Sequence, residues 1–486
     1  MTGKAALLLL LSGGLFAAEF RTGQAARAVF GQSSFTSRDP GVKATSLVVA
    51  GSQLFVADSS QRVLTFNLSD LGSVRDDRAA SQEVSCAVCE STPAGETKQA
   101  VMPGVAAVSV WGKTVAVADT AHHHVLIWRD ATAPRLDRGP DVVLGQADEA
   151  TPGRTTLVNP VSVALDGKRL FVGDTALHRV LVWNRLPVSG DEPADAVLGQ
   201  ADFTTTAPAD TPASDSIVSP VAMASDGNDL FVADAAENRV LVFSPADAAL
   251  TRDSVINSAS LSNGPAAPGM LVTIQGAQFT ESNETAPAGP ESPLPRNLGG
   301  VEVIFDGIAL PVLAVSPSEV QTQLPYDLGS RAGASLYLRM ERGGKVIVTN
   351  AVNMKLVPAN PGLFALGGSE PRPGILLHNA AKGASSAPPV TEENPARPGE
   401  VLTIWATGLG ALLDDGVTVA APITAQINGQ PVSVISARRI EGATGVYEVR
   451  VTVPAGWRGR QEGQLSIAQN GFSSNTITFP LARFRR

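Results

Sequence analysis

The sequence predicts an all-β protein, on three observations. Stretches such as "LFVADAAENRVLVF", residues 230–243, are apolar at both odd and even positions, so a strand there is buried on both faces. Closely similar stretches occur four times. The 486 residues include 46 Gly and 34 Pro, and no helical stripe of apolar residues follows the first twenty. The length indicates two or three domains.

Residues 1–18 are typical of a secretory signal peptide. Lys4 precedes an apolar stretch that is too short for a comfortable membrane span, and small residues follow it. No second apolar run of spanning length occurs. We therefore expect an exported protein, periplasmic, on the outer surface or extracellular, with no integral membrane span after removal of the signal. An uncleaved anchor is the alternative.

Four repeats follow in residues 19–250. They read "LFVADSSQRVLTFN" from Leu54, "VAVADTAHHHVLIWR" from Val115, "LFVGDTALHRVLVWN" from Leu170 and the stretch quoted above from Leu230. Self-similarity at this period is typical of architectures in which each unit buries its apolar faces against its neighbours.

A second element, "VFGQ" or "VLGQ", ends at Gln32, Gln146 and Gln200. The last repeat has no such element after it, whereas the first copy precedes every repeat. The N-terminal strand is therefore expected to complete the final sheet and close a β-propeller, with four blades. An unclosed partial propeller completed by dimerisation is the alternative.

The pattern "P-x-x-V-A-x-D-G…L-F-V-A-D-x-x-x-N-R-V-L-V-F", fullest over 220–243 and seen again over 160–183, resembles NHL-repeat propellers. The "VLGQ" element followed by "ADF" at 201–203 is similar to the bacterial secreted subset of those repeats. Members of that family usually have more than four blades, a departure that bears on the blade count here.

The repeats share an acid and, in three copies, an Arg. We expect each acid at the turn between two strands, where its carboxylate accepts neighbouring backbone amides, and each Arg in the same turn. His124 takes the place of the Arg in the second repeat. The shared residues are Asp58, Asp119, Asp174, Asp234, Arg62, Arg179 and Arg239.

His122 and His124 are the candidate metal ligands, because alternate histidines on a strand can chelate an ion. The competing interpretation is a surface turn, since the NHL pattern itself allows His or Asn at the intervening position. No cofactor is predicted, and a metal ion in the propeller channel is left open. Cys86 and Cys89, the two cysteines of the chain, are candidates for a local disulfide.

A different duplication fills the second half. "PGMLVTIQGAQF" from Pro268 matches "PGEVLTIWATGLG" from Pro398, and further pairs follow in the same order. Short strands between Gly/Pro turns predict two Ig-like sandwiches, 251–358 and 359–486. The first motif resembles the opening of IPT/TIG domains, and the whole order resembles an uncharacterised C-terminal domain family of secreted acidobacterial proteins, which implies architecture without chemistry.

The formal net charge of −9, without a Lys/Arg-rich run, makes nucleic acid a poor partner. We expect an exported, non-catalytic binding, adhesion or scaffold protein: a propeller that binds an unknown protein, peptide or polysaccharide, followed by Ig-like spacers. One alternative is a metal-dependent lyase or lactone hydrolase with its site in the propeller channel, for which Asp141, Asp166 and Asp226 are available. Another is a purely structural envelope protein.

Overall fold

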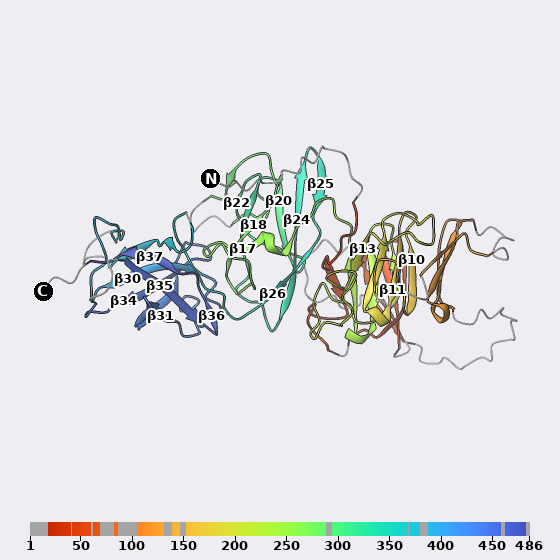
Figure 1. Ribbon diagram of the computed structural model, residues 1–486, viewed down its shortest axis with the longest axis horizontal. Helices are drawn as coiled ribbons and strands as arrows, with labels where there is room; N and C mark the ends of the chain where they lie inside the picture. The colour runs from red at the N-terminus through yellow and green to blue at the C-terminus, as the bar shows by residue number, and fades with distance from the viewer. Residues whose placement is uncertain are drawn as a thin grey trace.

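The protein is all-β, as the sequence predicts. The computed structural model describes residues 18–39, 41–59, 62–68, 82–85, 105–130, 139–145, 152–287, 294–367, 369–379, 387–457 and 462–482. Within these residues the chain forms sheets that are antiparallel except where Arg372–Pro373 pairs parallel with Ile477–Pro480. Single 3-10 turns lie at 120–122, 175–177, 235–237 and 252–254. Three bodies lie in a row along the molecule (Figure 1).

The first body contains four four-stranded antiparallel sheets, of which the first three are paired in sequence order. Sheet 1 is β2 (Ala44–Ala50), β3 (Gln53–Asp58), β4 (Arg62–Asn67) and β5 (Gln82–Ser85). Sheet 2 is β6 (Val105–Trp111), β7 (Thr114–Asp119), β8 (His124–Trp128) and β9 (Val142–Leu144). Sheet 3 is β10 (Pro160–Leu165), β11 (Leu170–Asp174), β12 (Arg179–Trp183) and β13 (Ala196–Leu198). Sheet 4 is β14 (Pro220–Ser225), β15 (Leu230–Asp234), β16 (Arg239–Phe243) and the N-terminal β1 (Ala28–Phe30).

The N-terminal strand completes the last sheet, as the position of the first "VFGQ" element predicts. β1 pairs antiparallel with β16, with Ala28 opposite Val242 and Phe30 opposite Val240. The chain thus joins residues more than 200 positions apart in one ladder, which protects an edge that would otherwise be open.

The middle strands of sheets 3 and 4 carry apolar residues on both faces because neighbouring sheets pack against both faces. Every residue of β11, β12, β15 and β16 is buried. Separate cores fill the junctions of sheets 2 with 3, 3 with 4, and 4 with 1. We call the first strands of the four sheets, β2, β6, β10 and β14, the inner strands. They contact one another in the order β6, β10, β14, β2. Closure of the ring between β2 and β6 is not seen among the described residues and stays a prediction.

The "VFGQ"/"VLGQ" element begins a tight turn at the end of the outer strands β1, β9 and β13. Gly31, Gly145 and Gly199 have φ of 82°, 91° and 87°, a region that disfavours side chains. The Gln that follows holds the turn of the neighbouring strand: Gln200 Nε2 donates to the carbonyls of His178 (3.3 Å) and residue 207 (3.2 Å). Gln146 lies outside the described residues. The motif is therefore structural in the copies that are described.

The second and third bodies are each two sheets packed over one core, as expected for sandwiches. The first pairs β17 (Val255–Asn257), β18 (Leu271–Gln275), β23 (Glu319–Gln323), β22 (Val312–Val315) and β19 (Glu284–Thr285) with β21 (Ile308–Ala309), β20 (Val301–Phe305), β24 (Gly333–Arg342), β25 (Lys345–Val348) and β26 (Val352–Lys355). The second pairs β27 (Gly362–Leu363), β29 (Leu376–His378), β30 (Val401–Thr407), β34 (Tyr447–Thr452) and β33 (Val434–Arg439) with β28 (Arg372–Pro373), β37 (Ile477–Pro480), β35 (Glu462–Gln469), β36 (Phe472–Ser473), β31 (Thr424–Ile427) and β32 (Gln430–Val432). Their relation to Ig-like domains stays a prediction.

Hydrogen bonds join the first body to the first sandwich. The amide of Ala25 donates to the carbonyl of Ala351 (3.0 Å), and Ser335 Oγ donates to the carbonyl of Ala26 (2.7 Å). Arg27 Nη2 donates to the carbonyl of Thr349 (2.8 Å). The N-terminal segment that completes sheet 4 therefore also contacts the sandwich.

A second set of hydrogen bonds joins the two sandwiches. The amide of Leu271 donates to Thr407 Oγ1 (2.9 Å), and Asn257 Nδ2 donates to the carbonyl of Asn360 (3.0 Å).

In the described part of the chain, no helix is long and apolar enough to cross a membrane.

Candidate functional site

Three of the four repeated Asp carboxylates accept backbone amides, but not those of their own turn. Asp174 accepts from the amides of Val158 and Asn159, both at 2.9 Å, which lie 15 to 16 residues earlier on the segment leading into β10. Asp234 accepts in the same way from Val218 (3.1 Å) and Ser219 (2.8 Å). Each acid therefore fixes the entry to its own sheet.

The other two acids show one shared and one different contact. Asp58 accepts the amide of Lys43 at 2.8 Å, again on the segment before its sheet. Asp119 instead contacts His122 Nδ1 at 2.8 Å, a pair in which the His side chain is 66% exposed. The second repeat therefore departs from the other three in sequence and in contacts.

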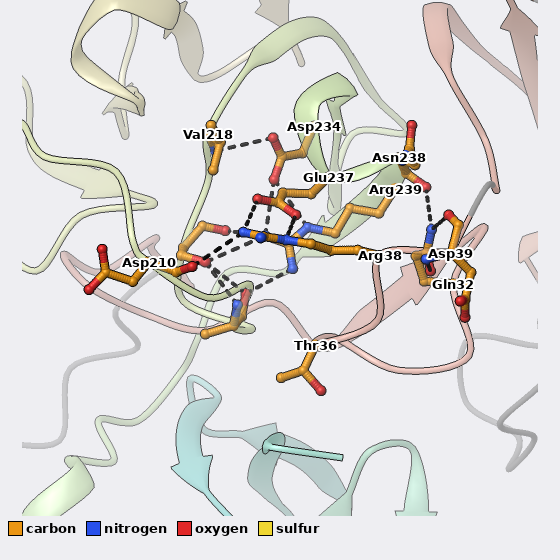
Figure 2. Close-up of polar contacts among 12 residues, drawn as sticks. Gln32, Thr36, Arg38, Asp39, Asp210, Val218, Asp234, Glu237, Asn238 and Arg239 are labelled. Carbon is orange, nitrogen blue, oxygen red and sulfur yellow. Dashed lines mark hydrogen bonds and ion pairs between the residues drawn. The ribbon is translucent and has the colours of Figure 1, made fainter. Parts of the chain in front are cut away.

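Of the two repeat arginines whose side chains are described, Arg239 makes the larger number of hydrogen bonds. Its Nε and Nη2 lie 3.1 and 3.0 Å from Asp234 Oδ2, and both side chains are fully buried. It also donates to the carbonyls of Phe35 (2.7 Å), Ala213 (3.0 Å) and Ser216 (2.8 Å). Figure 2 shows this guanidinium beside the loop that follows β1. One cation thus joins sheet 4, its entry segment and the N-terminal segment.

The other two arginines are placed at equivalent positions. Arg179 is also buried and donates to the carbonyls of Phe203 (2.7 Å) and Thr156 (2.8 Å), and burial lowers the pKa of its guanidinium. Arg62 pairs with Asp58 across β3 and β4, while its side chain lies outside the described residues. Where their contacts are described, these residues bind the chain's own backbone.

An ion pair adds to the N-terminal attachment on sheet 4. Arg38 Nε lies 2.6 Å from Glu237 Oε2 and its Nη2 lies 2.8 Å from Oε1, a two-point pair in which the carboxylate is almost fully buried (Figure 2). Beside it, Gln32 Nε2 donates to the carbonyl of Asn238 at 3.0 Å. The polar cluster in Figure 2 is therefore a clasp for the returning N-terminal strand.

The residue directly before the shared Arg, or before His124 in the second repeat, adopts a left-handed conformation. His123, His178 and Asn238 have φ of 60°, 52° and 52°. Nδ1 of His178 lies 2.6 Å from the carbonyl of Val218, on the segment leading into the next sheet. His123 contacts the carbonyl of Val158 in the same way. These histidines join neighbouring sheets.

The two predicted metal ligands lie on either side of the second-repeat acid, Asp119. His122 binds Asp119 at the surface, and His124 lies half-buried at the start of β8, opposite that acid on β7. Over the ranges that the structure describes, no group of three or more His, Cys, Asp or Glu side chains is arranged to hold a metal. Cys86 and Cys89 lie outside the described residues.

The three acids considered for a channel site lie at two different places. Asp166 and Asp226 cap the turns that follow β10 and β14, and Asp166 pairs with Arg169 at 2.6 Å. Asp141 accepts the amide of Arg129 at 2.8 Å beside β9, the outermost strand of sheet 2. Asp141 therefore does not lie with the other two.

A feature that the sequence reasoning missed lies at the turn end of the inner strands. Trp111 ends β6, is 43% exposed, and its indole lies directly against Gly167 in the turn after β10. A Cβ on Gly227, in the turn after β14, would lie 3.6 Å from the indole edge. We call Trp111, Gly167, Gly227 and the exposed Lys168 and Asn228 the indole platform.

The platform joins an apolar ring from sheet 2 to polar turns from sheets 3 and 4. Arg169 Nη2 donates to the carbonyls of Gly227 and Asn228, both at 3.2 Å, and holds two of the turns together. Burial, aided by the nearby Asp226 carboxylate, raises the pKa of Asp229. The signal in the sequence was a Trp at the strand end where the third and fourth repeats have Asp.

Comparisons with known proteins give little further information. No family model matches the chain, and no curated protein matches it. Among solved structures, an endo-fucoidan hydrolase, MfFcnA4 from glycoside hydrolase family 107, is matched at a TM-score of 0.13 and 10% identity, over 45% of this chain and 28% of that chain. A TM-score this low carries no argument about fold or function.

Proposed function

We propose that this chain is an exported, non-catalytic binding protein in which the indole platform contacts the ligand and the two sandwiches act as a spacer. The 43% exposure of Trp111 is the observation that carries the proposal. A Trp supplies a large apolar contact area with little conformational freedom to lose, and a polar edge for hydrogen bonding. Gly167 and Gly227 have no Cβ, which lets the ring lie close to the turns after β10 and β14.

The chemistry of the platform favours a neutral ligand with both apolar faces and hydroxyl or amide groups, a polysaccharide or a peptide. Lys168 and Asn228 supply donors beside the ring, and the Asp226 carboxylate supplies an acceptor. The recurring Asp and Arg side chains whose contacts are described are bonded within the fold, and this supports a structural role for them. Export and the NHL-like and Ig-like relationships belong to the same proposal.

Retention on polysaccharide and peptide arrays tests the proposal. We expect the protein to retain a ligand, and Trp111→Ala to weaken retention at least tenfold, as expected for loss of an aromatic anchor worth about 2 kcal/mol. Leu366→Ala is a matched control, because Leu366 is 58% exposed in the second sandwich, away from the platform. Retention unchanged by Trp111→Ala would overturn the placement of the site, and a protein that retains nothing would support a structural envelope role instead.

A further inference from the structure

Two apolar sheet faces at the ends of the four-sheet array are exposed. On β6, Val108 is 58% and Val110 is 60% exposed, and on β2, Val48 is 57% exposed. The apolar side chains Val163, Ala164 and Met223, on the inner strands of sheets 3 and 4, are buried. The repeat makes it possible to say which surface each exposed face fits.

The inner strands align through their pairing with the shared acids. Ala44, Val105, Pro160 and Pro220 each lie opposite the Asp of their own repeat. Three residues further along each strand are Leu47, Val108, Val163 and Met223, on what we call the leading face. These residues are 7%, 58%, 4% and 8% exposed, so Val108 alone of the four lacks cover.

The residues that follow define the opposite, trailing face. They are Val48, Ser109, Ala164 and Ala224, and Ala164 is 3% exposed whereas Val48 is 57% exposed. The leading residue Met223 of sheet 4 shares a core with the trailing residue Ala164 of sheet 3. Leu47 of sheet 1 likewise packs with Ala224 of sheet 4.

The remaining junction follows the same rule. Val163 of sheet 3 packs in a core that includes Ala107 from the trailing side of sheet 2, and Ser109 Oγ on that side accepts the amide of Leu165 at 3.0 Å. Three junctions thus join a leading face to a trailing face. The leading face of sheet 2 and the trailing face of sheet 1 are left over, one of each kind.

We infer that these two faces bind a second copy of this chain, with the leading face of sheet 2 in one copy packed on the trailing face of sheet 1 in the other. A two-fold axis makes both contacts at once and closes the association at two chains. The resulting ring would contain eight sheets, within the usual range of about four to eight blades.

A second copy fits the observations better than contact between the two ends of one chain. The three existing junctions are packed to side-chain exposures of a few per cent, and bringing β2 against β6 in the same chain would change the angles of those packed junctions. Association of two copies covers the same faces without disturbing them. The inference is independent of the ligand proposed for the indole platform.

The test uses two variants that each change one face, Val48→Lys and Val108→Glu. Both residues are exposed in the single chain, so neither change disturbs its fold. We expect the unmodified protein to be a two-chain particle by size-exclusion chromatography with light scattering. Each variant alone places a charge in both contacts and should raise the dimer dissociation constant on the order of a hundredfold or more.

An equimolar mixture of the two variants is the decisive sample. In a mixed pair, one contact is unmodified and the other joins the new Lys to the new Glu, so the two-chain particle should return. Leu366→Glu, at a matched exposure of 58%, should remain a dimer. The inference is wrong if the unmodified protein has the mass of one chain at tens of micromolar, if the variants stay dimeric, or if mixing does not restore association.

Discussion

Replacing Arg239, whose guanidinium is buried in sheet 4, is the sharpest test of how the fold is stabilised. Arg239 and Asp234 are fully buried, and the cation has two contacts with Oδ2 of the acid, at 3.0 and 3.1 Å. Replacement by Met keeps much of the volume but leaves a buried carboxylate without its counter-charge. Such a loss costs about 3 to 5 kcal/mol.

Arg239 also donates to three backbone carbonyls, and each loses its donor in the variant. The expected cost therefore lies toward the upper end of that range. Because a chain of several bodies need not unfold in one step, native-state hydrogen exchange is the appropriate assay. We expect Arg239→Met to lower the opening free energy of the β1 and β16 amides by about 4 kcal/mol. Amides in the second sandwich should keep their protection.

A double variant separates the charge effect from loss of packing. In Arg239→Met with Asp234→Asn, the buried carboxylate is gone while the amide oxygen still accepts from the entry segment. We expect the double variant to recover about 1 to 3 kcal/mol relative to Arg239→Met. A loss below 1 kcal/mol in the single variant, or no recovery in the double variant, would refute the reasoning.

Three further predictions concern the turn motif, the half-buried Asp229, and the contact between the first body and the first sandwich. Gly199→Ala places a Cβ 2.6 Å from Ile217 Cβ at a φ of 87° and should cost about 2 kcal/mol or more by denaturant titration, whereas Gly456→Ala, with open space around it, should cost less than about 0.5 kcal/mol. The folded-state pKa of Asp229 lies above its ordinary value of 3.8, so the folded protein binds this proton more tightly than the unfolded chain does, and stability falls as pH rises from 3.8 through the raised pKa. Asp229→Asn should therefore stabilise the protein at pH 7 and not at pH 3. Equal effects at both pH values would contradict this. Arg27→Ala removes hydrogen bonds to the carbonyls of residues 245 and 349 and should broaden the range of particle lengths in small-angle scattering, while an unchanged curve would show that the other junction bonds suffice.

The repeat architecture could be predicted because it is a local pattern copied four times. Apolar residues on both faces of 230–243 predicted sheets covered on both sides, and the unpaired first "VFGQ" element predicted the return of β1 to sheet 4. These features are set by the period of side chains along a strand and by the order of the copies.

The site could not be predicted in the same way, because it depends on contacts distant in sequence. The shared Asp was expected to serve its own turn, yet the amides it accepts from lie 15 to 16 residues earlier. Trp111 became a candidate when the turns of two other sheets were found beside it. Asp141 was grouped with Asp166 and Asp226 by residue type, and the strand order separates them.

The measurement that tests the central claim most directly follows the chemical fate of a retained ligand. Protein and ligand are incubated together for hours, with and without a chelator, and the ligand is then weighed by mass spectrometry. A non-catalytic binding protein predicts an unchanged ligand mass and the same affinity in both samples. A cleaved or rearranged ligand, or binding abolished by the chelator, would contradict the account and favour a metal-dependent enzyme.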